Sequence, residues 1–344
     1  MKFIAIGELM LRLSPPNYEK LVTTHDFRVN YGGAEANVAV SLANLGVDST
    51  FFTVLPNTDL GKSCINYLKA NDVHTKHIIK SDGRMGLYYL EEGVSVRPSQ
   101  VIYDRGSSAF AEYDYKDVDF ENILKDYDWL HLSGITPALS YNCRRLIDKA
   151  IKAAKKYGTI VSYDLNYRPS MWEAIGGLAK AQEVNKEVAK YVDVMIGNEE
   201  DFTACLGFEI EGNDENLKTL NLDGYKKMIN EAAATYPNFK AVATTLRQVK
   251  TATVNDWSAI CWADGEIYKA AQYDGLEIMD RVGGGDSFAS GLVYGLMTFE
   301  DAEKAVNYGA AHGALAMTTP GDTTMASLKE VEGIVGGAGA RVQR

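Results

Sequence analysis

The sequence contains few cysteines, and their spacing excludes two common structural roles. The 344 residues include four scattered cysteines, namely Cys64, Cys143, Cys205 and Cys261. No two of them form a C-x-x-C pair, so neither a zinc cluster nor a disulfide framework is indicated. His74 and His77 are three residues apart, but no neighbouring ligand completes a metal site. We therefore expect buried, reduced thiols in a cytoplasmic protein.

Positive charge is also scarce. Lys and Arg number 35 against 46 Asp and Glu, which gives a formal net charge of −11 at pH 7. The lysines form no run, so the basic surface that nucleic-acid binding requires is missing. An anionic ligand would have to be bound by individual arginines or by backbone N–H groups, against the field of the whole protein.

No apolar run is long enough to cross a bilayer. The N-terminal stretch "MKFIAIGELMLRL" is apolar, but it carries Glu8 and Arg12 and has no cleavage site. It predicts a first buried strand from Phe3 to Ile6 that ends at Gly7. We expect no membrane association.

Two nucleotide-binding motifs are missing as well. "PNTDLGKS" ends like a P-loop, but Pro56 stands where the first glycine is required. No G-x-G-x-x-G follows the first predicted strand, which argues against a dinucleotide-binding oxidoreductase.

The sequence does contain alternating strand and helix patterns. Strand patterns fall at residues 2–7, 49–56, 126–134, 159–168, 192–197, 240–246 and 251–271. Helix patterns fall at residues 32–46, 60–72, 140–158, 285–297 and 300–317. This alternation predicts an α/β fold with a largely parallel sheet, in one domain over residues 1–335. Residues 336–344 are expected to form a flexible tail.

Two segments interrupt the alternation, at about residues 11–31 and 84–110. Both are rich in strand-forming residues and have no helix pattern between the runs. We expect them to form a small antiparallel sheet outside the main one.

Ligands of open parallel sheets bind beyond the carboxyl ends of the strands. Polar residues follow several of the predicted strands, namely Glu8, Asp164, Asn166, Arg168, Asn198, Asp201 and the loop 283–286. These positions are the candidates for a binding site.

"RVGGGDSFASG", residues 281–291, places three glycines before Asp286 and a helix of small residues. A helix N-terminus offers unpaired N–H groups and positive potential, and glycines let a ligand approach closely, which suits a phosphate. A carboxylate beside a transferring phosphoryl group can accept the proton of the attacking hydroxyl. In the alternative interpretation, the glycines form a plain loop and Asp286 caps the helix.

Two long motifs together resemble the signatures of a known family. "YGGAEANVAVSLANLG" and "DRVGGGDSFASG", the second from Asp280 to Gly291, are similar to those of ribokinase-like carbohydrate kinases, the phosphofructokinase-B family. Gly284 replaces the usual alanine. The resemblance implies a doubly wound α/β fold with a small β lid, and ATP and Mg²⁺ as cofactors. It also implies that Asp286 is the catalytic base and that Gly283, Gly284 and Gly285 form an anion hole.

Within the family, the likeness is greatest to 2-keto-3-deoxygluconate kinases. "IAIGELMLRLSP", "VIYDRGSSA", "LHLSGITPALS" and "YDLNYRPSMW" are similar to stretches of those enzymes. The resemblance implies a set of substrate-binding residues, namely Glu8, Gly33, Asn37, Tyr88, Tyr103, Arg105 and Arg168. Arginine suits a sugar acid because its guanidinium can bind a carboxylate with two parallel hydrogen bonds. Alternatively, Arg105 is an exposed lid residue and Arg168 forms a structural ion pair.

The sequence departs from the family pattern at the nucleotide site. The family's N-x-x-E reads "GNEED" here, so Asn198 would contact the nucleotide and Asp201 would bind magnesium through water. Glu199 or Glu200 could serve instead, and the three acids could equally complement the helix dipole. The T-x-G-x-x-G loop is missing, and Thr245 and Arg247 are expected to face the nucleotide phosphates.

The sequence thus predicts an ATP-dependent kinase that phosphorylates the terminal hydroxyl of 2-keto-3-deoxygluconate. The alternatives are a kinase of a neutral sugar such as fructose or ribose, a NAD-binding oxidoreductase, and a non-catalytic sugar or nucleotide sensor. We also expect a homo-oligomer formed through the lid sheet, because an exposed edge strand invites pairing.

Overall fold

A large, mostly parallel sheet forms the centre of the molecule. The computed structural model describes residues 1–210 and 221–337, and in it the strands follow the order β14-β13-β12-β11-β10-β9-β1-β4, with β15 paired to β13. The parallel strands are β1 (Lys2–Ile6), β4 (Asp48–Phe52), β9 (Trp129–Ser133), β10 (Ile160–Asp164), β11 (Val194–Gly197) and β12 (Ala241–Thr251). The antiparallel strands are β13 (Val254–Ala263), β14 (Glu266–Lys269) and β15 (Tyr273–Glu277).

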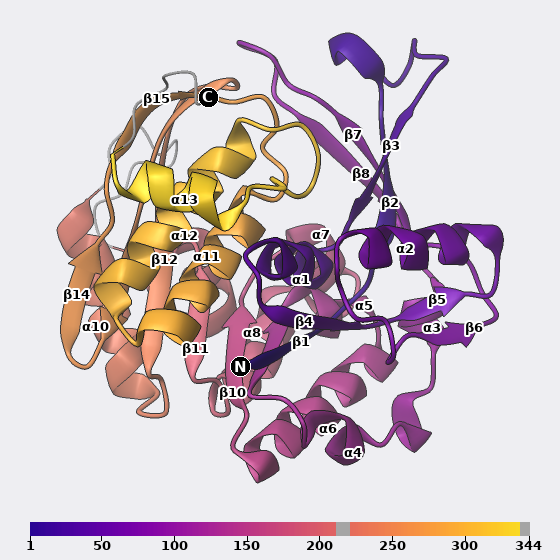
Figure 1. The fold of residues 1–344 in the computed structure, drawn as a ribbon, viewed down its shortest axis with the longest axis horizontal. Coiled ribbons are helices and arrows are strands. Elements are labelled where there is room, and N and C mark those ends of the chain that lie inside the picture. Colours follow the sequence, from indigo (N-terminus) through magenta and orange to yellow (C-terminus); the bar gives the residue numbers. More distant parts are fainter. Residues whose placement is uncertain (211–220, 338–344) are drawn as a thin grey trace.

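Helices cover both faces of this sheet (Figure 1). Side chains alternate along a strand, so Phe3 and Ala5 of β1 join one apolar core while Ile4 and Ile6 join the other. The first core includes α1 (Ala34–Asn44), α2 (Asp59–Ala70), α11 (Gly284–Phe299), α12 (Ala302–Met317) and α13 (Leu328–Val335). The second includes α3 (Ala109–Glu112), α4 (Phe120–Leu124), α6 (Tyr141–Tyr157), α8 (Gly177–Ala189) and α10 (Leu222–Thr235). The predicted doubly wound sheet is confirmed.

Local signals set the ends of these helices. In α6, Ser140 caps the N-terminus by accepting a hydrogen bond from the Cys143 amide at 3.1 Å, and Gly158 ends the helix with φ of +72°. Further short elements include β5 (Val54–Pro56), β6 (Ile79–Ser81), α5 (Ile135–Leu139), α7 (Pro169–Glu173) and α9 (Glu199–Asp201). All four cysteines are buried and free.

A second, four-stranded sheet projects from the edge of the main body (Figure 1). Its strand order is β3-β2-β7-β8, with bounds β2 (Met10–Ser14), β3 (Arg28–Gly32), β7 (Leu87–Glu91) and β8 (Gln100–Asp104). The β2–β3 and β7–β8 pairs are antiparallel, whereas β2 and β7 run parallel. The expectation of an antiparallel sheet was therefore wrong for the central pair, which joins the two separate segments of the chain. That this small sheet moves as a lid stays a prediction.

The remaining expectations about the chain concern membranes and the tail. No helix within residues 1–210 and 221–337 combines the length and the apolar character needed to cross a membrane. Of the predicted tail, Gly336 and Gly337 follow α13, and residues 338–344 lie outside the described part of the chain.

Candidate active site

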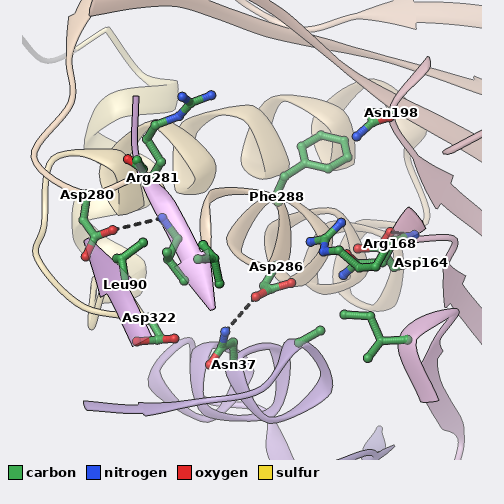
Figure 2. A pocket seen from close by; sticks show the side chains of 18 of the residues that line it. Asn37, Leu90, Asp164, Arg168, Asn198, Asp280, Arg281, Asp286, Phe288 and Asp322 are labelled. Carbon is green, nitrogen blue, oxygen red and sulfur yellow. Dashed lines mark hydrogen bonds between the residues drawn. The ribbon is translucent and has the colours of Figure 1, made fainter. Parts of the chain in front are cut away.

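A cavity of about 570 Å³ lies where the strand ends of the main sheet, the small sheet and the start of α11 meet. Figure 2 shows Asp286 in this cavity, between Asn37 on one side and Asp164 and Arg168 on another. The strand ends supply polar groups here because the carboxyl ends of parallel strands share one edge of the sheet.

The glycine run opens α11. Gly283 is the N-cap with φ of +80°, and the Ser287 amide donates the first intrahelical bond, to the Gly283 carbonyl at 2.8 Å. The N–H groups that precede Ser287 are those that a helix leaves without an intrahelical acceptor. They are thus available to an anion.

The three glycines differ in what requires them. A Cβ on Gly283 would overlap the carbonyl oxygen of Asp322, so packing and φ both demand glycine there. On Gly284 a Cβ would lie 3.3 Å from Cγ of Met317, a tight but flexible contact. On Gly285 it would meet no protein atom within 4 Å, and Gly285 lines the cavity. Packing therefore does not explain Gly285, and the open space beside it would allow a ligand to approach the backbone closely.

Asp286 is the third residue of α11, and its carboxylate faces the cavity. Nδ2 of Asn37 donates a hydrogen bond to its Oδ2 at 2.7 Å (Figure 2). Burial raises the pKa of Asp286 to about 7, and Glu35 and Asp322 add to the effect, while the Asn37 hydrogen bond and Arg168 oppose it. A carboxylate that exchanges its proton near neutrality is suited to act as a base.

Asp164, at the end of β10, lines the same cavity as Asp286. Burial raises its pKa well above the ordinary value, and the charges of Asp201 and Asp286 raise it further. Arg168, the N-cap of α7, opposes this shift. Asp164, Asp201 and Asp286 thus share the positive charge of Arg168. One arginine cannot neutralise three carboxylates, so a further cation would be favourable here.

Asp201 has a structural role that the sequence left open. Its Oδ2 accepts the Asn198 amide at 2.8 Å and its Oδ1 accepts the Tyr167 amide at 2.7 Å. Oδ1 of Asn198 accepts the Asp201 amide at 2.9 Å, which completes a capping box at α9. Burial raises the pKa of Asp201 to about 6.

On the side of the small sheet, Arg105 is buried rather than exposed. Its Nε and Nη2 both donate to Oε2 of Glu8, at 2.8 and 2.5 Å. Glu8 therefore holds Arg105 rather than reaching the cavity itself. The ring of Tyr103 lies 5.8 Å from Cζ of Arg105 and 6.0 Å from the ring of Tyr88. The hydroxyl of Tyr88 donates to Oδ1 of Asp322.

On the opposite side, the predicted nucleotide residues lie on a strand. β12 continues to Thr251 and forms a hairpin with β13, so Thr245 and Arg247 stand on regular sheet rather than on a glycine-rich loop. Arg281, two residues before the first glycine, was not singled out by the sequence. Burial lowers its pKa to about 10, and the positive charge of Arg247 lowers it further. Among the described residues neither arginine forms an ion pair, although Glu199 and Glu200 attract Arg247.

The structure brings nearly all the predicted site residues to this one cavity. Its lining includes Gly33, Asn37, Tyr88, Tyr103, Arg105, Arg168, Asn198, Asp201, Thr245, Arg247, Gly283, Gly285 and Asp286. Glu8 and Gly284 are the two that are not part of the described lining. The sequence analysis did not include Arg281, although its position close to the glycine run could have indicated a role in the site. It also missed Asp322, which has no local signal because its partner Tyr88 is 234 residues away.

A model described as the pfkB family of carbohydrate kinases matches residues 2–329. The crystal structure of 2-dehydro-3-deoxygluconokinase from Thermotoga maritima is similar with a TM-score of 0.92 and 42% sequence identity, covering 98% of this chain and 99% of that one.

Two curated relatives extend the similarity over almost the whole chain. The 2-dehydro-3-deoxygalactonokinase of Haloferax volcanii is 31% identical over 345 residues, covering 100% of this chain and 99% of the relative. The 5-dehydro-2-deoxygluconokinase of Geobacillus kaustophilus is 27% identical and covers 96% and 92%. The three names agree on phosphorylation of a dehydro-deoxy sugar acid and differ in which one.

Proposed function

Because the chain belongs to the pfkB family of carbohydrate kinases, it is a phosphotransferase, and we propose that it transfers the γ-phosphoryl group of ATP to a 2-keto-3-deoxy sugar acid. The proposed acceptor is the terminal hydroxyl of 2-keto-3-deoxygluconate. The main support for the proposal is the carboxylate of Asp286, with a pKa of about 7, beside the amides of a helix start and in one cavity with Arg105 and Arg168.

In the proposed reaction, Asp286 accepts the proton of the terminal hydroxyl as its oxygen attacks the γ-phosphorus. Asn37 orients the carboxylate by its hydrogen bond at 2.7 Å. The bond from the γ-phosphorus to the β,γ-bridging oxygen breaks, and ADP leaves with that electron pair. The amides of Gly283, Gly284 and Gly285 stabilise the charge on the transferring group.

Arg247 and Arg281 support placing the nucleotide at the end of the cavity beyond the glycine run. They are two like charges in one cavity, without ion pairs in the described part of the chain. In Figure 2 the guanidinium of Arg281 lies on the same side of Asp286 as Phe288 and Asn198, away from Asp322. A polyphosphate would compensate both charges. Thr245 and Asn198 line the same region.

Arg105, Arg168 and Tyr103 would bind the sugar acid at the other end. Glu8 is a positioning residue in this scheme, because it fixes the guanidinium of Arg105 by two hydrogen bonds. Gly33 begins α1 against the backbone of Glu8, where a Cβ would overlap the Glu8 carbonyl oxygen. The carboxylate of the substrate would approach the remaining N–H groups of the two arginines.

The acidic residues fit a magnesium ion held mainly by phosphates and water. No group of three or more His, Cys, Asp or Glu in the described ranges could hold a metal alone. Mg²⁺ in nucleotide enzymes keeps several waters and one or two carboxylates. Asp164 would supply one carboxylate and Asp201 another through water. When bound, magnesium neutralises charge on the phosphates.

A panel of acceptors tests the proposal. Release of ADP is measured with 2-keto-3-deoxygluconate, 2-keto-3-deoxygalactonate, 5-dehydro-2-deoxygluconate, fructose and ribose. We expect kcat/KM for a keto-deoxy acid to exceed that for either neutral sugar by about 100-fold or more, since a lost charged hydrogen bond costs roughly 1.5–3 kcal/mol and two arginines contribute. A preference for fructose or ribose would contradict the proposed substrate.

Arg105→Gln separates the acid from the neutral acceptors. It should raise the KM for the keto-deoxy acid about tenfold to 100-fold and leave that for fructose nearly unchanged. Arg145→Gln is the matched control, because Arg145 lies on α6, is 43% exposed and pairs only loosely with Asp114 at 3.6 Å. Equal losses for both kinds of acceptor would indicate that Arg105 supports the fold rather than the carboxylate.

We also propose a homo-oligomer formed through the small sheet. β8 is exposed along its length, and Ile102 is 45% exposed, between Val101 and Tyr103, which both line the cavity. Ile102→Asp should convert an oligomer to monomers in light scattering coupled to gel filtration. An unchanged mass would place the interface elsewhere.

A further inference from the structure

A buried arginine connects the small sheet to the loop that opens α11. Arg12 lies in β2 with 1% of its side chain exposed, and it is not among the described residues that line the cavity. Its Nη2 donates to Oδ2 of Asp280 at 2.5 Å, and its Nη1 donates to Oδ2 of Asp322 at 3.2 Å. The side chains of Asp280 and Asp322 are 2% and 1% exposed. All three charges are therefore removed from solvent.

Both aspartates contact the loop that leads into α11. Oδ1 of Asp280 accepts the Val282 amide at 3.0 Å, and its Oδ2 accepts the Gly321 amide at 3.0 Å. The carbonyl of Asp322 lies against Gly283, at the place that a Cβ would occupy. The conformation of the loop before α11 thus depends on where these two aspartates sit.

The same arginine is fixed on the small sheet. Arg12 stands opposite Tyr88 in the register of β2 and β7, and the hydroxyl of Tyr88 donates to Asp322. Its Nε donates to Oγ of Ser14 at 2.9 Å, and Glu92 lies 3.4 Å from Nη2. Arg12 therefore connects the small sheet, which carries Tyr88, to the loop before α11, which carries the amides of the glycine run.

The electrostatics make this contact costly to break. Burial lowers the pKa of Arg12, but Asp280 and Asp322 outweigh it and raise the pKa overall. Removal of the guanidinium would leave two buried carboxylates without a counter-charge, and such groups protonate or move apart. A lysine could not reproduce the contact fully, because its single ammonium lacks the planar fork that reaches both aspartates.

Resting on the proposed function, we propose that Arg12 is a positioning residue that couples sugar-acid binding at the small sheet to nucleotide binding at the glycine run. Contacts of the substrate with Tyr88, Tyr103 and Arg105 would hold the small sheet in place. Through Arg12 and Asp280, this would hold the amides of the glycine run in the geometry that binds the γ-phosphate.

The coupling is measured by binding a non-hydrolysable ATP analogue in the absence and in the presence of saturating sugar acid. The ratio of the two dissociation constants is the coupling factor, and typical values are about 5- to 150-fold. We expect a factor in this range for the native protein and a factor below about twofold for Arg12→Met. A merely structural role would lower the melting temperature and the active fraction but leave the ratio unchanged.

Asp280→Asn provides a second variant, because it keeps Arg12 and the size of the side chain while it removes the charge. It should lose most of the coupling even if Arg12→Met does not fold. Lys155→Met is the matched control, since it breaks an ion pair with Asp193 at 2.5 Å between α6 and the residue before β11, away from the cavity. It should keep the native ratio.

Two results would overturn the inference: a native protein without coupling, or a folded Arg12→Met or Asp280→Asn variant with the native ratio. Failure of the proposed substrate is distinguishable from both. If the native protein phosphorylates another carbohydrate instead, the same ratio is measured with that carbohydrate, and the inference is judged on it.

Discussion

Asp286→Asn is expected to stop turnover while it raises the stability of the folded protein. The substitution keeps an oxygen that can accept the hydrogen bond from Asn37. It removes the group that would accept the proton of the attacking hydroxyl, so kcat should fall about 10²- to 10⁴-fold. In the native protein, kcat/KM should rise with pH and level off above an apparent pKa of about 7.

The gain in stability follows from the same pKa. In the folded protein the pKa of Asp286 is about 7, against an ordinary value of 3.8. Between these two pH values the folded state holds a proton that the unfolded state has lost, so native stability falls as pH rises through this range. A shift of roughly three units corresponds to at most about 4 kcal/mol at pH 8. Solvent in the cavity screens part of this cost, and we expect about 1–2 kcal/mol.

The assay is thermal unfolding of both proteins at pH 6 and pH 8. An unfolding entropy of about 2.1 cal/mol/K per residue implies that 1–2 kcal/mol shifts the melting temperature of a chain of 344 residues by about 1.5–3 °C. The melting temperature of the variant should exceed that of the native protein by this amount at pH 8 and by less at pH 6.

Glu330→Gln is the matched control, because Glu330 also stands third in its helix, α13. The amide and hydroxyl of Ser327 donate to its carboxylate, both at 2.7 Å, and lower its pKa. Removal of the charge of Glu330 should therefore lower the melting temperature, whereas Asp286→Asn should raise it. An Asp286→Asn variant that is less stable than the native protein at pH 8, or that keeps more than about a tenth of its turnover, would refute the reasoning.

Three further predictions follow from the cavity. Gly285→Ala should lower kcat/KM for ATP about tenfold or more, because the added methyl group would occupy space in the cavity. Its melting temperature should change little, because the Cβ meets no protein atom within 4 Å. Gly284→Ala should be nearly neutral in both steady-state kinetics and melting temperature. Arg281→Gln should raise the KM for ATP about tenfold without changing the KM for the acceptor. In calorimetry it should weaken ADP binding and leave adenosine binding unchanged. The surface control Arg145→Gln should change neither the KM for ATP nor the affinity for ADP. Glu8→Gln should raise the KM of the keto-deoxy acid severalfold by loosening Arg105. An unchanged KM would show that Glu8 does not position Arg105 for the substrate.

Several parts of the site could be predicted from the sequence because their signals are local. Three glycines followed by small residues indicate a tightly turned helix start, and the structure places that start at Gly283. Polar residues after buried strands, such as Asp164 and Arg168, indicated one edge of a parallel sheet. Both features depend on backbone preferences within a few neighbouring residues.

Other parts were open to two interpretations that only contacts could separate. The sequence left open whether Asp201 caps a helix, and the structure shows both of its oxygens accepting backbone amides. Its contact with magnesium through water stays a prediction. Arg105 could be exposed or buried, and its place against Glu8 decides that it is buried. Tyr167 is 34 residues away from Asp201 in the sequence, and Glu8 is 97 residues away from Arg105. Motifs and periodicity of neighbouring residues cannot predict contacts at such separations.

The alternation of strands and helices, the glycine run with its carboxylate and the resemblance to a kinase family can all be recognised in the amino-acid sequence. The contact of Arg12 with Asp280 across 268 residues, and the cavity that Arg247 and Arg281 share, become visible in the folded structure. The same holds for the burial that raises the pKa of Asp286 to about 7. The physical reason is that backbone conformation follows largely from neighbouring residues, whereas burial and the pairing of charges depend on which distant segments the fold brings together.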